Sequence, residues 1–220
     1  MLELKKISHY YTSYNTNNKV LSSVDISFEK SSITTIFGNS GTGKTTLLNI
    51  AGLIIVPSEG QIIIDKQNVN NSKNTSSIRL QYFGYVFQNH YLLPEFTIEE
   101  NLILPGVISG DNKKEINNRV SKYLDRFGLN FIKNKYPHHI SIGEAQRVAV
   151  IRSLINKPKI IIADEPTSNL DDENADKISN LFKELKEENK YAIVIATHDK
   201  RFLQISDNNY KLNNKNLIKL

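Results

Sequence analysis

The sequence contains no cysteine and no long hydrophobic run, and both absences restrict what the chain can be. Without cysteine among its 220 residues, disulfide frameworks and cysteine-ligated metal centres are excluded, although this alone does not fix the compartment. The longest apolar runs, such as residues 53–56, are far shorter than a membrane-spanning helix requires. Residues 1–6 contain no apolar segment of the kind found in signal peptides, so we expect none.

A strong charge of one sign is also missing. The formal net charge is +5, and the lysines are scattered among asparagines instead of forming one arginine-rich face. We therefore expect a solvated surface and no nucleic-acid partner. With 39% hydrophobic and 23% charged residues, the chain has an ordinary globular composition, and its length suits one α/β domain or a core with a subdomain.

A glycine-rich segment, residues 38–45, is the most informative part of the sequence. It reads Gly-Asn-Ser-Gly-Thr-Gly-Lys-Thr and lies between an apolar β-branched run at 33–37 and a helical start at 46–51. Strand, glycine loop, lysine, threonine and helix in this order match the phosphate-binding P-loop pattern. The backbone N–H groups of such a loop and the positive end of the helix dipole bind phosphate, so the pattern predicts a nucleotide site.

Two side chains of this segment have separate expected roles. Lys44 can reach the outer phosphates as a cation, and the Thr45 hydroxyl can ligate Mg²⁺. The alternative is a glycine-rich turn with a surface lysine. The nucleotide-binding residues predicted here are Gly38, Asn39, Ser40, Gly41, Thr42, Gly43, Lys44, Thr45 and Thr46.

Hydrophobic periodicity predicts an α/β fold with an inserted helical part. Strands are expected at 2–7, 24–29, 33–37, 61–64, 82–87, 160–163 and 192–196, and polar loops at 10–19 and 68–77. Helical patterns fill 89–157, with capping boxes at 97–100 and 141–144 and an amphipathic stretch at 111–127. A helix at 171–189 and a hairpin about Asn213 and Asn214 complete the pattern. We predict one domain over 1–220, with an α/β core at 1–88 and 158–220 and a helical subdomain at 89–157.

Four polar residues follow predicted strands. Gln88, Asp164, Glu165 and His198 each lie at or just past the C-terminal end of an apolar strand, as the P-loop does. In an open α/β sheet, ligands bind at this edge. Taken singly, such a glutamine is usually a turn residue and such a histidine is usually solvated. Together, around a P-loop, they predict a phosphoryl-transfer site.

The chemistry suggests a role for each of these side chains. Asp164 is expected to support Mg²⁺ directly or through water, and Glu165 suits a general base that polarises the attacking water. The alternative for Glu165 is a surface acid. Gln88 is expected to contact Mg²⁺ or the water, and His198 to hydrogen-bond the γ-phosphate. The predicted catalytic residues are Glu165, His198, Gln88 and Lys44, and the predicted Mg²⁺ ligands are Thr45, Gln88 and Asp164.

A capped helix start at residues 141–144 is the remaining diagnostic segment. It reads Ser-Ile-Gly-Glu and could be purely structural. The same geometry, however, offers a hydroxyl and free backbone N–H groups to an anion. If this segment faced the P-loop of its own chain, no second copy of the chain would be needed.

In order and spacing, these motifs resemble those of the ATP-binding cassette (ABC) transporter ATPases over nearly the whole chain. The matches are Walker A at 38–45, the Q-loop at Gln88, the signature at 140–144, Walker B at 160–165, the D-loop at 168–171 and the switch histidine at 197–199. The resemblance implies a P-loop NTPase (RecA-like) core, an N-terminal antiparallel β subdomain and an inserted α-helical subdomain. It also implies that Ser141, Gly143 and Glu144 contact the nucleotide and that Tyr11 stacks on adenine. Tyr10 is a rival, and either tyrosine could instead lie at a strand edge.

The resemblance implies a mechanism as well. ATP and Mg²⁺ are the implied cofactors, and the ATP-bound state is a head-to-tail homodimer in which each signature caps the γ-phosphate on the partner's P-loop. Hydrolysis reopens this dimer, and the opening motion is passed to integral membrane permease subunits, which dock around residues 89–106. The chain is therefore expected to be cytoplasmic and peripheral on the inner face of the membrane. Residues 86–94 and 100–102 are similar to the branch of MacB and the lipoprotein-releasing ATPases, which includes peptide exporters and bacteriocin-immunity exporters.

One position departs from the family pattern, because the first signature glycine is replaced by Ile142. A β-branched residue is costly wherever a positive φ is needed. As the first residue of a capped helix, Ile142 can adopt ordinary helical angles. We therefore expect Ser141 and the Gly143 N–H to cap ATP, with slower turnover.

The expected function is an ATPase subunit that powers a separate permease, for export of or resistance to a peptide, lipid, lipoprotein or drug. The alternative is a nucleotide-dependent regulator of a membrane complex, of the cell-division type, with little transport. A soluble repair or translation ATPase is disfavoured because no long coiled-coil insertion or second cassette is present. A P-loop kinase is disfavoured because nothing marks an acceptor site, and His198 and the signature would lack roles.

Overall fold

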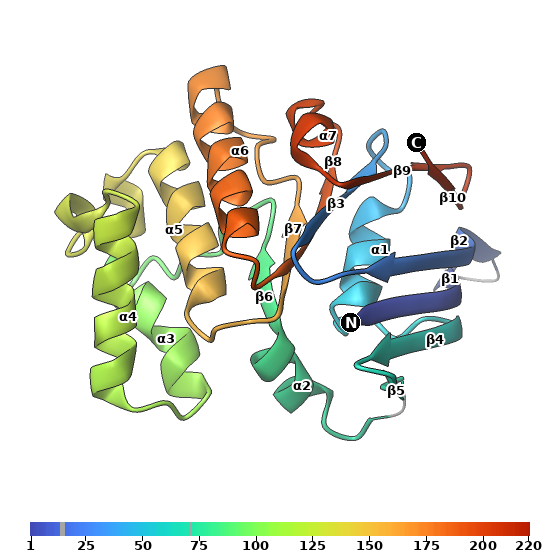
Figure 1. Cartoon of the computed structure of the whole chain (residues 1–220), viewed down its shortest axis with the longest axis horizontal. Coiled ribbons are helices and arrows are strands. Elements are labelled where there is room, and N and C mark those ends of the chain that lie inside the picture. The colour runs from blue at the N-terminus through green and yellow to red at the C-terminus, as the bar shows by residue number, and fades with distance from the viewer. Residues whose placement is uncertain (14–15, 71) are drawn as a thin grey trace.

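Two sheets organise the molecule (Figure 1). The computed structural model of the chain describes residues 1–13, 16–70 and 72–220. One sheet is four-stranded with the order β2-β1-β4-β5, and the other is six-stranded with the order β10-β9-β3-β8-β7-β6. Figure 1 shows the four-stranded sheet at one end of the molecule and α3, α4 and α5 at the other, with the six-stranded sheet between them. The expected α/β architecture with an antiparallel N-terminal sheet is confirmed.

The antiparallel sheet consists of β1 (Leu2–Ser13), β2 (Thr16–Phe28), β4 (Glu59–Ile64) and the short β5 (Gln67–Asn68). Every pairing within it is antiparallel. The loop expected at 10–19 is wrong, because β1 and β2 continue through this segment and pair up to Ser13 and Thr16. Tyr14 and Asn15, also in that expected loop, lie outside the described residues. The extension is polar because backbone pairing, rather than burial of an apolar face, holds its strands together.

The second sheet contains the strands that bear on function. They are β3 (Ser32–Phe37), β6 (Phe83–Val86), β7 (Ile160–Asp164), β8 (Ala192–Thr197), β9 (Asn208–Asn213) and β10 (Asn216–Lys219). All neighbouring strands are parallel except β10, which runs antiparallel to β9. The C-terminal ends of β3, β6, β7 and β8 therefore meet at one edge of the sheet. The expected C-terminal hairpin is present, with its left-handed turn at Asn214 and Lys215, one residue later than predicted.

Helices cover both faces of this sheet. α1 (Lys44–Ala51) packs on one face, where its leucines join a core with Ile160 and Ile162 of β7. α6 (Asp172–Glu187) and α7 (Arg201–Ile205) pack on the other face with Ile161 of the same strand. Buried β7 thus alternates between two cores, which explains its uninterrupted apolar sequence. α2 (Thr75–Tyr82) begins inside the loop expected at 68–77, so that expectation is wrong there, and α7 was not anticipated.

The segment between β6 and β7 is helical, as the sequence predicts. It contains α3 (Ile98–Ile108), α4 (Lys113–Arg126), two 3₁₀ turns (Asn130–Ile132 and Pro137–His139) and α5 (Ile142–Leu154). Both expected capping boxes are present, at the starts of α3 and α5. These helices share a hydrophobic cluster, and α5 also contributes Val150 and Leu154 to the core beneath α6. The division of the chain at residues 89 and 157 stays a prediction.

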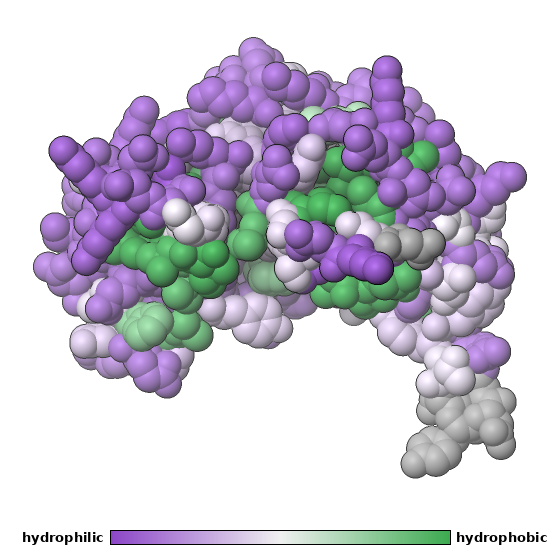
Figure 2. Space-filling model, turned by 90° about the horizontal axis from the view of Figure 1, so that it is seen from below, coloured by the Kyte–Doolittle hydropathy of each residue, from purple (hydrophilic) through white to green (hydrophobic). Residues whose placement is uncertain are grey.

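The surface is mostly polar. Figure 2 shows one face covered largely by hydrophilic residues, with hydrophobic residues gathered in patches near the middle of the view. Across the described parts of the chain, no helix combines the length and apolarity needed to cross a membrane.

Candidate nucleotide-binding and hydrolysis site

The P-loop joins the end of β3 to the start of α1. Gly41 and Gly43 have φ values of 77° and 103°, in the left-handed region that favours glycine. Gly43 is the N-cap of α1, and a Cβ atom placed on it would lie 2.8 Å from Cγ1 of Val20. The backbone conformation and the neighbouring strand therefore both require glycine at position 43. The resulting bend wraps the loop around the helix N-terminus, which is the geometry of an anion-binding nest.

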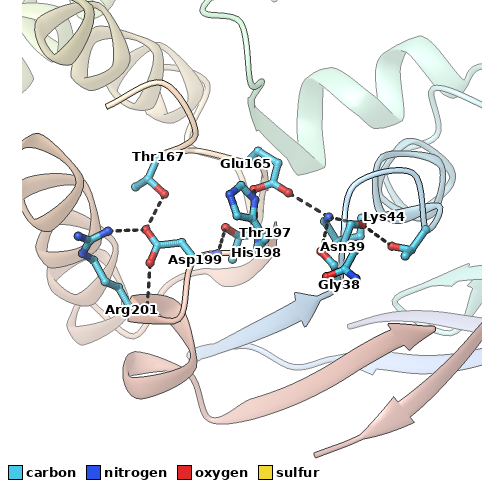
Figure 3. Close-up of polar contacts among 10 residues, drawn as sticks. Gly38, Asn39, Lys44, Glu165, Thr167, Thr197, His198, Asp199 and Arg201 are labelled. Atoms are coloured by element: carbon cyan, nitrogen blue, oxygen red, sulfur yellow. Dashed lines mark hydrogen bonds and ion pairs between the residues drawn. The ribbon is translucent and has the colours of Figure 1, made fainter. Parts of the chain in front are cut away.

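Lys44 lies beneath this loop, and its side chain is only 5% exposed. Its Nζ donates hydrogen bonds to the carbonyl oxygens of Gly38 at 2.7 Å and Asn39 at 3.1 Å. The same ammonium group lies 3.0 Å from Oε1 of Glu165 (Figure 3). The loop thus fixes one buried cation, as expected for a residue that binds the outer phosphates.

A cavity of about 350 Å³ lies over the P-loop. It brings together most of the predicted site residues: Tyr11, Ser40, Gly41, Gly43, Lys44, Thr45, Thr46, Gln88, Glu165 and His198. Ser168, the first residue of the segment that resembles the D-loop, also lines it, as does Val20, which the sequence did not single out. Three other P-loop residues support the loop itself: the carbonyls of Gly38 and Asn39 hold Lys44, and the Thr42 hydroxyl donates to Asn39 O at 2.9 Å.

The two candidate tyrosines point in different directions. The Tyr11 hydroxyl is 3.2 Å from Oγ1 of Thr46, so this ring lies beside the start of α1. The Tyr10 hydroxyl donates instead to Glu59, on β4. A register shift in β1 between His9 and Tyr10 sets which tyrosine faces the cavity. The structure therefore favours Tyr11 as the aromatic residue at the nucleotide site.

Glu165, which follows β7, is held between Lys44 of α1 and His198, which follows β8. One carboxylate oxygen pairs with Lys44, while Oε2 lies 2.9 Å from Nδ1 of His198 and accepts the His198 N–H at 3.3 Å. The backbone of Glu165 has a φ of 46°, and its N–H donates to Ala196 O at 2.8 Å. A left-handed conformation in a residue other than glycine is uncommon and often marks a functional position. The carboxylate is fixed at the cavity wall, where it can accept a proton from water.

Asp164 lies at the end of β7 with its Oδ1 atom buried and without a hydrogen-bond partner among the described residues. Burial raises the pKa of this carboxyl, and the nearby charge of Glu165 raises it further. A hydrogen bond from Thr45 and the positive charge of Lys44 act in the opposite direction and lower the pKa. A buried carboxylate oxygen without a partner, as Oδ1 is, is costly.

A divalent cation would supply the missing partner for Asp164 Oδ1. The Thr45 hydroxyl, the Asp164 carboxylate and the amide oxygen of the cavity-lining Gln88 form the oxygen-rich donor set that Mg²⁺ prefers, with one carboxylate and room for phosphates. The residues present therefore fit Mg²⁺.

The signature residues do not line this cavity. Ser141 caps α5, where its Oγ accepts the Glu144 N–H at 3.2 Å and its own N–H donates to Glu144 Oε2 at 2.7 Å. Ile142 is the first residue of α5, lacks a positive φ and is 56% exposed, so the expected helical conformation is present. A Cβ atom on Gly143 would lie 2.5 Å from Oδ1 of Asn174 in α6. This close packing of α5 on α6, which the sequence did not reveal, favours glycine at position 143, because a larger residue would displace the Asn174 side chain.

Comparison with known proteins agrees with this geometry. The sequence model described as "ABC transporter" matches residues 21–168. Among curated relatives, the lipoprotein-releasing system ATP-binding protein LolD of Rickettsia bellii is 42% identical over 212 residues, which cover 96% of this chain and 95% of the relative. LolD of Cytophaga hutchinsonii is 41% identical over 209 residues, which cover 94% of this chain and 95% of the relative.

Solved structures show the same fold. The dimeric post-hydrolysis structure of the ATP-binding cassette MJ0796 bound to ADP and Pi has a TM-score of 0.91 and 32% identity, covering 100% of this chain and 99% of that one. CbiO1 from Clostridium perfringens, part of an ABC transporter complex, has a TM-score of 0.86 and 28% identity, covering 99% and 86% of the two chains. The expected P-loop NTPase fold is confirmed. The chain therefore belongs to the ABC transporter family, as an ATP-binding cassette that hydrolyses ATP.

Proposed function

We propose that this chain works as a head-to-tail homodimer on the cytoplasmic side of a membrane and drives a separate integral membrane permease. The proposal of a dimer rests on one observation, which is that the two phosphate-binding motifs of the chain lie apart. The P-loop lines the cavity, whereas the exposed signature segment at Ser141 and Ile142 lies outside it. A second copy can place its signature over this P-loop, and the dimeric cassettes of similar fold support that arrangement.

The cargo proposed for the permease comes from the relatives. Several curated relatives at 41–43% identity are named lipoprotein-releasing system ATP-binding proteins. We therefore propose that the permease partner moves a lipoprotein, within the broader class of peptide, lipid and drug exporters. The groups that bind nucleotide contain nothing specific to such cargo, so its recognition is assigned to the permease.

The roles of the site residues follow from their contacts. Lys44, already held by two P-loop carbonyls, donates to the outer phosphates of ATP. Thr45, Asp164 and Gln88 would hold Mg²⁺, which would neutralise charge on the phosphates. Tyr11 provides a ring at the cavity rim for the base. Ser141, Gly143 and Glu144 act at the partner's nucleotide, with Glu144 keeping the helix start in its capped form.

Glu165 acts as the general base, and its contacts provide a control on that activity. In the structure, Lys44 occupies one of its oxygens and His198 the other. Phosphate competes with Glu165 for the Lys44 cation, so nucleotide binding frees an oxygen of Glu165 to accept a proton from water. The His198 backbone N–H keeps this carboxylate oriented, and one N–H of the His198 ring donates to the γ-phosphate. Catalysis is then positioning and charge stabilisation, as in other phosphoryl transfers.

Reconstitution tests this proposal. The chain is co-purified with its candidate permease in lipid vesicles, and ATP hydrolysis is measured with and without a triacylated lipoprotein. We expect the lipoprotein to stimulate hydrolysis and to be released from the membrane only when ATP is present. Hydrolysis without release would instead favour the regulator alternative. Release that is independent of ATP would contradict the proposal.

A further inference from the structure

Arg201, the first residue of α7, contacts three carboxylates on two different elements. Its Nη1 lies 2.8 Å from Asp199 Oδ2, its Nε lies 2.7 Å from Asp176 Oδ1, and its Nη2 pairs with Asp172. Asp199 is in the turn after β8, whereas Asp172 and Asp176 are in the first turns of α6. Each nitrogen of the guanidinium therefore serves a different carboxylate. Lysine, with a single nitrogen, cannot reproduce this arrangement.

Through Asp199, Arg201 is connected to the two segments that carry the catalytic residues Glu165 and His198. Asp199 follows His198 directly, and its Oδ2 also accepts the Thr167 hydroxyl at 2.9 Å (Figure 3). Thr167 lies two residues after Glu165. Burial alone would raise the pKa of Asp199, but hydrogen bonds from the Arg201 backbone and side chain and from Thr167 outweigh it and lower the pKa. A charged Asp199 thus joins the ends of β7 and β8.

Through the first turns of α6, Arg201 is also connected to the signature segment at the start of α5. Between the two α6 aspartates lies Asn174, whose amide donates to both carboxylate oxygens of Asp171 at 2.9 and 3.1 Å. Its side-chain oxygen lies so close to Gly143 that a Cβ atom there would be 2.5 Å away. The first turn of α6 therefore packs directly on the first turn of α5.

We propose that Arg201 is a positioning residue that joins the segment carrying His198 to the N-terminus of α6 and, through Asn174, to the signature residue Gly143. Since the signature acts on the partner's nucleotide, this connection links the γ-phosphate contact in one site of the dimer to the cap over the other site. The inference rests on the proposed dimeric function. A surface ion pair with only local effect would contribute little to stability and nothing to communication between sites.

The test removes only the α6 side of the connection. In the Asp172→Ala/Asp176→Ala variant, Arg201 keeps Asp199 and no residue of the nucleotide site is changed. Glu173→Ala is the matched control, because Glu173 lies in the same first turn but, among the residues that the structure describes, pairs only with Lys177 in its own helix. Arg201→Lys keeps the charge but loses the three-way contact. For each protein we measure kcat, the Hill coefficient for ATP, the Kd for a fluorescent ATP analogue and the melting temperature.

We expect the double variant and Arg201→Lys to bind the analogue within about twofold of wild type, but to lose about tenfold in kcat, a typical size for coupling between sites. Their Hill coefficient should fall towards one, and Glu173→Ala should match wild type. Unchanged kcat and Hill coefficient in both variants would overturn the inference, as would losses of kcat and binding that simply follow a lower melting temperature. Failure of the proposed function is distinct, because wild-type protein would then show neither hydrolysis nor ATP-dependent dimers.

Discussion

Replacing Glu165 with glutamine tests the assignment of the general base. The amide keeps the size of the carboxylate and can still accept the His198 N–H, so the cavity wall should stay intact. It cannot accept a proton from water near neutral pH. General-base catalysis is worth about 10²–10⁴ in rate, or about 3–5 kcal/mol in the barrier, and we expect a loss of this size in single-turnover hydrolysis.

The affinity of the Glu165→Gln variant for ATP should not fall with its rate of hydrolysis. Lys44 loses its ion pair with Glu165 at 3.0 Å but keeps the carbonyls of Gly38 and Asn39, so its cation becomes more available to phosphate. We therefore expect affinity for a fluorescent ATP analogue to be equal to or higher than that of wild type. Because the Glu165→Gln variant binds ATP without hydrolysing it, it should also run as a dimer in size-exclusion chromatography with ATP.

The matched control is Glu59→Gln, which removes a carboxylate that contacts Tyr10 outside the cavity. It should leave hydrolysis unchanged. Glu165→Gln turnover within tenfold of wild type would refute the base assignment. A large loss of ATP affinity in the same variant would refute the proposed competition between Glu165 and phosphate for Lys44.

Three further substitutions test the remaining groups. Lys44→Ala removes a charge-assisted hydrogen bond worth about 1.5–3 kcal/mol, so the Kd for ATP should rise by at least about tenfold, and an unchanged Kd would count against the P-loop role. The raised pKa of Asp164 means that the folded chain holds a proton there more readily than the unfolded chain does, a contribution to stability that is present at acidic pH and lost as the pH rises through that pKa. Asp164→Asn should therefore melt higher than wild type at neutral pH without Mg²⁺ and ATP, melt similarly in acid, and lose Mg²⁺-dependent hydrolysis; a lower melting temperature at neutral pH would contradict this. Ile142→Gly, assayed with the permease, should hydrolyse ATP at least as fast as wild type, whereas an inactive wild type that glycine restores would show that Ser141 and Gly143 do not suffice as a cap.

The sequence predicts the parts of the fold that are locally encoded. The P-loop pattern at 38–45 fixes a strand, a turn and a helix, and the capping boxes at Thr97 and Ser141 locate the starts of α3 and α5. Buried strands such as β7 are recognisable because apolar side chains are needed on both faces. Residues at the ends of such strands meet at one edge, which is why Glu165 and His198 were correctly grouped with the P-loop.

Other features depend on contacts between distant segments. The β1–β2 extension is held by backbone pairing of polar residues, so no periodicity marks it. The register shift beside Tyr10 decides which tyrosine faces the cavity, and alternation cannot reveal such a shift. The short helix α7 buries only Phe202, too little for an amphipathic pattern to be seen. The packing of Gly143 on Asn174 and the three contacts of Arg201 arise only once α5, α6 and α7 are assembled.

Cysteine cross-linking tests the central claim, that each site is completed by the signature of a partner chain. Because the sequence has no cysteine, Ser40→Cys in the P-loop and Ile142→Cys at the signature can be introduced without background, and both positions are exposed. The two single-cysteine proteins, each also carrying Glu165→Gln, are mixed and treated with a short bifunctional maleimide. We predict a cross-linked heterodimer that forms only with ATP, and no intramolecular link in one chain carrying both cysteines. Absence of the ATP-dependent heterodimer, or an efficient link within one chain, would contradict the account.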